Sequence, residues 1–166
     1  LGLTDFATIV YSDGTREKVA NPRYLKKAQR KLRKEQRSLS RKVGPDKRTK
    51  QKPSNNWKKQ QKKVAKAYSA IAHRRSDFHN KLVHRLTYEN QVVEKLSVRG
   101  LSRAGAKGAR GRGLRRSVSD AGWGSFLTKL AAKSAELGRY HEAINPAYTS
   151  QACSLCGVID GPKPLS

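Results

Sequence analysis

The feature that most constrains the fold of this chain is a long amphipathic segment, residues 54–88. Its apolar side chains recur at intervals of three, four or seven residues, which is the spacing of one face of an α-helix. These side chains are Trp57, Val64, Tyr68, Ile71, Phe78, Leu82 and Leu86. Because the stripe is narrow and Lys and Arg crowd the other faces, the pattern predicts a long helix that packs along one seam.

The segment before it supplies a partner helix. Asn21 is a good N-cap and Pro22 suits the first helical position, so we expect a helix to begin there. Apolar residues then follow at helical spacing, and Glu35 interrupts them. They are Leu25, Ala28, Leu32 and Leu39. Glycine and proline among charges make residues 43–53 a loop, so the whole predicts an antiparallel helical hairpin.

Strands are predicted on both sides of the helical hairpin. β-Branched and aromatic residues flank the Asp13-Gly14 turn, so residues 3–19 should form a β-hairpin. Residues 91–98 and 139–144 are further strand candidates. This order predicts an α/β fold with a long helical insertion.

Two more segments lie between the later strands. Residues 99–116 are rich in Gly and Arg, which favours a flexible basic loop. Ser119 or Asp120 should then cap a helix that ends before Gly138.

The net charge of +25, from 37 Lys and Arg against 12 Asp and Glu, indicates a polyanionic partner. Nucleic acid is the first candidate, and an anionic membrane surface is the second. Residues 22–52 contain only two acids, Glu35 and Asp46, whereas a solvated helix usually alternates signs. The candidate phosphate-binding residues are Lys26, Lys27, Arg30, Arg33, Arg37, Lys58, Lys59, Lys62, Arg110 and Arg112.

Length and composition argue against several other classes. A chain of 166 residues normally forms one domain. No stretch approaches the ~18 apolar residues of a membrane-spanning helix, and no N-terminal apolar run resembles a signal peptide. Two cysteines three positions apart cannot form a disulfide framework, which fits a reducing compartment. We therefore expect a cytoplasmic, nucleoid-associated protein.

Glu94 lies in the middle of an apolar row. In the predicted strand it shares a face with Val92, Leu96 and Val98, because alternate residues of a strand point the same way. An unpaired buried carboxylate is costly. Glu94 is therefore a metal-binding acid, a partner in a structural ion pair, or a residue of an edge strand in contact with water.

Cys153 and Cys156 form a Cys-x-x-Cys pair followed by Gly157. Two thiolates at this spacing can coordinate one Zn²⁺, and a complete zinc ribbon needs two more ligands. A redox dithiol is the competing interpretation, but no thioredoxin-like βαβ pattern precedes the pair. The pair predicts half of a zinc ribbon.

Five local strings, in this order, resemble one family. They are LGLTDFAT at residues 1–8, NPRYLKKA at 21–28, VVEKLSVRGL at 92–101, SDAGWGSF at 119–126 and PAYTSQACSLCG at 146–157. Together they are similar to the OrfB/TnpB proteins of bacterial and archaeal insertion sequences. Those transposases are understood as RNA-guided DNA endonucleases akin to the nucleases of type V CRISPR systems.

The resemblance implies a RuvC-type nuclease of the RNase H-like fold. Acidic residues in such a site hold Mg²⁺ or Mn²⁺ for phosphodiester hydrolysis. Matched by motif, Glu94 corresponds to the second catalytic acid, and Cys153 and Cys156 to the first pair of zinc ligands. The family also implies DNA and a guide RNA as partners, with no membrane and no small-molecule cofactor.

The same resemblance predicts that this chain is an internal fragment. The first catalytic Asp of the family stands immediately before the Leu-Gly-Leu string, and the second zinc pair and the third acid follow later. We therefore expect a partial sheet, a helical hairpin insertion, and no DNA cleavage by the fragment alone. The expected parts are residues 1–20 (β-hairpin), 21–90 (basic helical hairpin), 91–145 (strand, loop, helix, strand) and 146–166 (zinc-ribbon start).

The alternative is a non-catalytic basic protein that binds DNA or RNA, either a decayed element product or a ribosomal-protein-like module. In that case Glu94 has only a structural role. The flanking coding sequence would separate the two interpretations, because only the nuclease requires an Asp codon upstream and a second Cys-x-x-Cys downstream.

Overall fold

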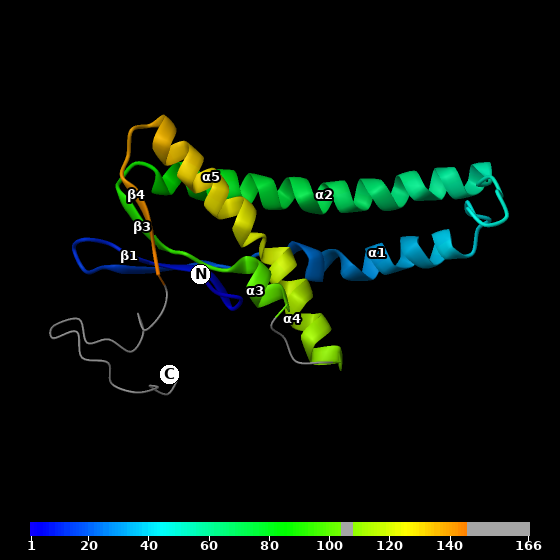
Figure 1. Ribbon diagram of the computed structural model, residues 1–166, viewed down its shortest axis with the longest axis horizontal. Helices are drawn as coiled ribbons and strands as arrows, with labels where there is room; N and C mark the ends of the chain where they lie inside the picture. Colours follow the sequence, from blue (N-terminus) through cyan, green and yellow to red (C-terminus); the bar gives the residue numbers. More distant parts are fainter. Residues whose placement is uncertain (104–107, 146–166) are drawn as a thin grey trace.

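The computed structural model describes residues 1–103 and 108–145, and Figure 1 shows a small α/β body from which a long helical arm extends. The elements are β1 (Asp5–Val10), β2 (Arg16–Ala20), α1 (Tyr24–Ser40), α2 (Asn55–Leu86), β3 (Gln91–Glu94), α3 (Val98–Arg103), α4 (Gly108–Ala121), α5 (Trp123–Glu136) and β4 (His141–Ile144). The α/β class and the order of the first strands and helices agree with the sequence pattern.

The helical arm is the predicted antiparallel hairpin of α1 and α2. Leu32, Val64 and Ile71 are buried in its seam. Glu35, which interrupts the apolar stripe of α1, makes a polar contact across the seam. Its carboxylate accepts a hydrogen bond of 2.6 Å from the buried Gln60 side chain. Tyr68 was expected in the seam, but its side chain is exposed and its hydroxyl accepts a hydrogen bond from Gln36.

The predicted start of α1 is wrong. The helix begins at Tyr24, and Arg23 precedes it in a left-handed conformation with φ 49° and no side-chain cap. The Asn21 side-chain nitrogen instead donates a hydrogen bond of 3.0 Å to the Leu3 carbonyl, and its oxygen accepts one of 3.1 Å from the Arg23 N–H. An Asx-type turn therefore occupies the residues that the sequence suggested for the cap.

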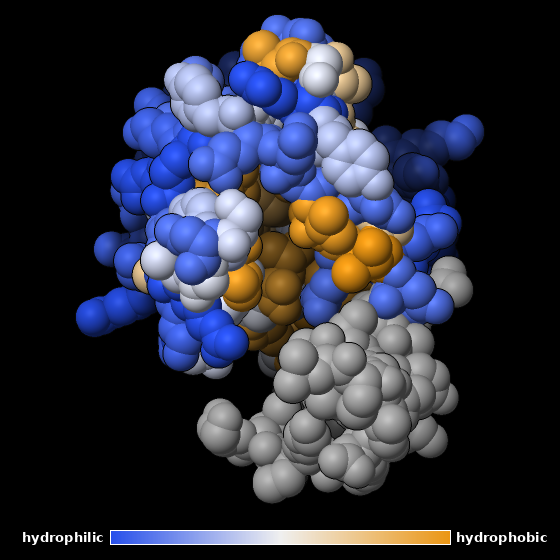
Figure 2. Space-filling view, turned by 90° about the vertical axis from the view of Figure 1, so that its left-hand side faces the viewer, coloured by the Kyte–Doolittle hydropathy of each residue, from blue (hydrophilic) through white to orange (hydrophobic). Residues whose placement is uncertain are grey.

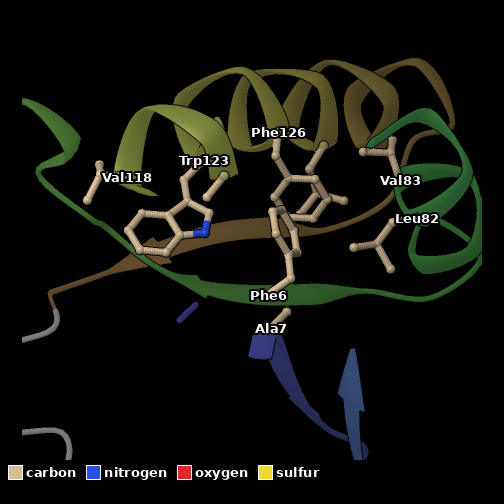
Figure 3. Packing of buried hydrophobic residues seen from close by; sticks show 9 residues of the cluster. Phe6, Ala7, Leu82, Val83, Val118, Trp123 and Phe126 are labelled. Carbon is tan, nitrogen blue, oxygen red and sulfur yellow. The ribbon is translucent and has the colours of Figure 1, made fainter. Parts of the chain in front are cut away.

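The core of the body is a cluster of aromatic rings from three elements. Phe6 of β1 packs edge-to-face against Phe78 of α2 and Phe126 of α5, with ring centroids 5.0 and 5.1 Å apart. Figure 3 shows Phe6 and Phe126 pointing toward one another, with Trp123 and Val118 beside them. This cluster joins the first strand to distant helices, because Phe78 follows Phe6 by more than seventy positions and Phe126 follows it by more than one hundred.

The described parts of the segment expected to be a flexible loop are helical. Residues 99–103 belong to α3 and residues 108–116 to α4, which continues to Ala121. Val118 and Ala121 are buried against the body, so packing at one end stabilises a helix whose glycines give it poor intrinsic propensity. The helix predicted to end before Gly138 is confirmed as α5, but its predicted start is wrong. Ser119 and Asp120 lie in α4, and Gly122, with φ 66°, separates α4 from α5.

The strands form two separate pairs. β1 and β2 are antiparallel, whereas β3 and β4 are parallel. The predicted strand 91–98 is too long: β3 ends at Glu94, the Leu96 N–H turns back to the Glu94 carbonyl at 2.9 Å, and Val98 begins α3. Leu96 and Val98 therefore do not extend the apolar row on which Glu94 was placed.

Candidate metal and nucleic-acid sites

Glu94 lies at the end of β3, beside a cleft of about 1040 Å³ that opens between β1 and β3. The cleft is lined by the main part of both strands and by Phe126, Leu127 and Leu130 of α5. Figure 2 faces the end of the molecule at which β1 and β3 lie, and it shows a hollow there with apolar side chains inside it. The carboxylate is thus held by a strand end next to a groove whose side formed by α5 is apolar.

The Glu94 side chain is 42% exposed and does not pair with any Lys or Arg side chain in the described residues. The Leu1 main-chain nitrogen lies 3.8 Å from the carboxylate. The ion pair with a basic side chain, one of the alternatives at the sequence level, is therefore not formed in this part of the chain. No group of three His, Cys, Asp or Glu that could hold a metal occurs among the described residues.

The two strands that border the cleft run in opposite directions. At one end the Leu1 nitrogen meets Glu94, the last residue of β3. At the other end, Tyr11 follows β1 and lies near Glu89, which comes just before β3. The pKa of Tyr11 is raised chiefly by its hydrogen bond to Glu17, at 2.8 Å, and the negative charge of Glu89 raises it further. In the described residues β1 pairs only with β2 and β3 only with β4, so each has an unpaired edge.

The candidate phosphate-binding residues of the arm are all exposed. Lys26, Lys27, Arg30, Arg33 and Arg37 lie along the outer side of α1, where Lys31, Lys34, Arg41 and Lys42 join them around a shallow basic depression. Lys58, Lys59 and Lys62 are exposed on the first turns of α2. None of these cations forms an ion pair with a carboxylate in the described chain, so their positive charge is uncompensated.

The remaining predicted residues have different outcomes. Arg112 is exposed on α4, and Arg110 belongs to the same helix rather than to a loop. Cys153 and Cys156 lie outside the described residues.

Sequence reasoning missed the residues that attach the arm to the body. Both carboxylate oxygens of Asp120 lie 3.0 Å from the Leu25 N–H, and one of them accepts a bond of 3.2 Å from Arg75. The Asp120 side chain is only 9% exposed. The sequence had indicated Asp120 only as a candidate cap of the following helix, in the string at residues 119–126.

His79 supports the same joint from α2. Its Nε2 donates to the Ala121 carbonyl at 3.0 Å, and its side chain is buried. Burial, followed by the nearby cations Lys129 and Arg75, lowers the pKa of His79. The ring is therefore neutral at physiological pH and serves as a hydrogen-bond donor at the end of α4.

The described residues contain no helix that is both long and apolar enough to cross a membrane. These residues form a small α/β body with a basic helical arm and a carboxylate beside a cleft.

The OrfB_IS605 family model, described as "Probable transposase", matches residues 1–105. A second model, described as "Cas12f1-like, TNB domain", matches residues 123–164. The chain belongs to the OrfB family of insertion-sequence transposases.

Individual relatives agree with this assignment. The chain is 36% identical over 168 residues to a protein of Streptomyces pristinaespiralis named "Putative RNA-guided DNA endonuclease", covering 99% of this chain and 37% of the relative. It is 38% identical over 166 residues to "Putative RNA-guided DNA endonuclease InsQ" of Escherichia coli K12, covering 94% of this chain and 38% of the relative. Over 108 residues, 60% of this chain and 20% of the relative, it is 30% identical to "CRISPR-associated endodeoxyribonuclease Cas12f1" of Syntrophomonas palmitatica. The chain thus spans little more than a third of the length of the first two relatives.

Proposed function

We propose that this chain is the central part of an insertion-sequence-encoded, RNA-guided DNA endonuclease that hydrolyses DNA with a divalent metal ion. The names of the relatives and the family match support the activity. The observation that carries the proposal in the structure is the position of Glu94, whose carboxylate faces the Leu1 nitrogen at the mouth of the cleft.

The cleft has the arrangement needed to receive one further strand. Within residues 1–103 and 108–145, β1 and β3 border it with unpaired edges and opposite directions, and α5 supplies an apolar floor. A strand that leads into Leu1 would run parallel to β3 and antiparallel to β1, and its main chain would satisfy both edges. The two pairs would then form one five-stranded mixed sheet in the order β2, β1, inserted strand, β3, β4, which is the RuvC-like sheet implied by the family resemblance.

The same insertion would place a second carboxylate beside Glu94. The residue before Leu1 is bonded to the nitrogen that lies 3.8 Å from the Glu94 carboxylate, and the family motif requires Asp at that position. Carboxylate oxygens are the ligands that Mg²⁺ and Mn²⁺ prefer, and Glu94 is exposed enough to hold an ion that also meets substrate. A bound ion would stabilise the negative charge that develops during phosphodiester hydrolysis.

The basic arm is the proposed nucleic-acid interface. Lys and Arg side chains that pair with no carboxylate of the described residues cover the outer side of α1, and they suit contact with a phosphate backbone more than base recognition. We assign this surface to the duplex formed by guide RNA and target DNA. Cys153 and Cys156, within the part of the chain matched by the TNB model, would form the first half of a zinc ribbon.

The experiment is a cleavage assay with the complete protein that contains this chain, its guide RNA and a matched target DNA. Glu94→Ala is expected to abolish cleavage while target binding persists. Glu89→Ala is the matched control, because this exposed acid lines the opposite end of the same cleft and should leave cleavage intact. Cleavage by the Glu94→Ala protein at the wild-type rate would refute the assigned role.

A further inference from the structure

Two arginines from different helices meet at one point between α1 and α4. With the Gln29 amide oriented so that its oxygen faces them, that oxygen accepts hydrogen bonds from Arg33 Nη2 at 2.8 Å and Arg116 Nη1 at 2.9 Å. The two guanidinium groups therefore lie on either side of a single neutral acceptor. Like charges held this close repel one another unless an anion joins them.

No carboxylate in the described chain neutralises this pair. The ion pairs formed there involve neither Arg33 nor Arg116. The nearest acid along α4 is Asp120, and both of its oxygens are occupied by the Leu25 N–H and Arg75. The surroundings are also basic, since Arg37 follows Arg33 by one turn and Arg112 precedes Arg116 by one turn on the same helix faces.

The helices that carry these residues diverge from their contact point. Figure 1 shows the N-terminal end of α1 next to the C-terminal end of α4, from which the two axes spread apart. The two arginines are exposed, so the site is open to a long ligand. Guanidinium groups bind phosphate oxygens in pairs and with defined geometry, which makes an extended phosphate backbone the fitting occupant.

Asp120 determines how the two helices meet. Arg116 and Asp120 lie one turn apart on α4, and Leu25, Gln29 and Arg33 are spaced by single turns on α1. The bond from the Leu25 N–H to Asp120 therefore brings Arg116 to Gln29 in the next turn. Asp120 also replaces the missing N-cap of α1, where a negative charge is favourable to the helix dipole.

We propose that Arg33 and Arg116 form a phosphate clamp for a nucleic-acid backbone, and that Asp120 is the positioning residue that holds α1 and α4 in the geometry of this clamp. The clamp rests on the proposed function, since it requires that the protein bind nucleic acid. It adds α4 and the joint at Asp120 to an interface that would otherwise consist of the arm alone.

The first test measures binding of the chain to a fluorescent RNA–DNA hybrid duplex over a range of salt concentrations. Arg33→Gln and Arg116→Gln should each lower the slope of log K against log salt by about 0.9, which corresponds to about fivefold weaker binding at physiological salt. Arg16→Gln is the matched control, because Arg16 is exposed on β2, away from both helices, and loses the same charge. The double variant should lose less than the two single losses combined, because the arginines act on one phosphate.

The second test uses Asp120→Asn, for which positioning and simple electrostatics predict opposite signs. The substitution makes the protein more positive, so charge alone would tighten binding, whereas the clamp requires weaker binding and loss of the coupling between Arg33 and Arg116. Asp77→Asn is the control with the same charge change, because Asp77 is exposed and pairs only with Lys81 one turn away in the described chain. Asp120→Glu should restore part of the affinity.

The outcomes separate the clamp from the function on which it rests. If the chain binds the duplex but both arginine variants behave like Arg16→Gln, the clamp is wrong and the proposed function stands. If the chain binds neither duplex nor single strands, the nucleic-acid part of the proposed function fails, and the clamp fails with it. Saturable binding of inorganic phosphate at the level of the duplex, lost in both variants, would instead assign the site to free phosphate and overturn the clamp.

Discussion

Gly122 separates α4 from α5 in a left-handed backbone conformation, so replacing it by alanine tests the joint between the arm and the body. Its φ is 66°, and a Cβ atom there would lie 2.8 Å from Arg75 Cδ and 3.1 Å from His79 Cε1. Arg75 is the residue that pairs with Asp120, and His79 donates to the Ala121 carbonyl. The added methyl group therefore strains the backbone and displaces both side chains that stabilise the joint.

The magnitude follows from these two effects. A non-glycine residue in the left-handed region costs roughly 1–2 kcal/mol. Displacing the Arg75 side chain weakens a charged hydrogen bond of 3.2 Å, which adds about 1–2 kcal/mol, at the low end because Arg75 is partly exposed. We expect Gly122→Ala to lower the free energy of unfolding by about 3 kcal/mol, a sum of these terms.

Gly113→Ala is the matched control, because Gly113 lies within α4 and an added Cβ there would meet no atom of the described residues within 4 Å. The same chemical change should there stabilise the protein by about 0.5–1 kcal/mol, since alanine favours a helix over glycine. Urea denaturation followed by far-UV circular dichroism measures both variants. A loss below about 1 kcal/mol for Gly122→Ala, smaller than the backbone strain alone, would refute the geometry of this joint.

Two further predictions concern the core. Phe126→Ala should destabilise the chain by about 3–5 kcal/mol in the same assay, because it removes a ring packed against Phe6 in the buried cluster; a loss similar to that of an exposed residue would contradict the packing. His79 should make stability depend on pH. Because burial lowers its folded pKa, its contribution is fully present above the unfolded pKa of about 6.5 and is lost as the pH falls through the folded pKa. His79→Gln should flatten the stability profile in this window, and an unchanged profile would count against a buried neutral ring.

The helical arm could be predicted from the sequence because its signal is local. The stripe from Val64 to Leu82 has the period of one helix face. Its first part, Val64 and Ile71, packs against α1, and Leu82 packs in the core of the body. Glu94 could be singled out because a carboxylate among β-branched residues is unusual, and the structure does place it at a strand end beside a cleft. In each case the pattern depends on residues within a few turns of one another.

The joint between arm and body could not be predicted, because its contacts are distant in sequence. Asp120 bonds the main chain of Leu25, 95 positions away, and this bond replaces the local cap suggested by Asn21. The helix α4 was missed for a related reason: its glycines disfavour a helix, while Val118 and Ala121 stabilise it by tertiary packing. The length of the strand at Glu94 was overestimated because apolar residues continue to alternate through Leu96, so the sequence pattern does not reveal the turn there.

We propose that Glu94 holds a divalent metal together with the residue that precedes Leu1. The most direct measurement is anomalous scattering from crystals of the complete protein grown with Mn²⁺. An anomalous peak is expected at the Glu94 carboxylate, between β3 and a strand inserted next to β1, and no peak is expected there in Glu94→Gln crystals. A Mn²⁺ site elsewhere in the protein, with Glu94 paired to a basic side chain instead, would contradict it.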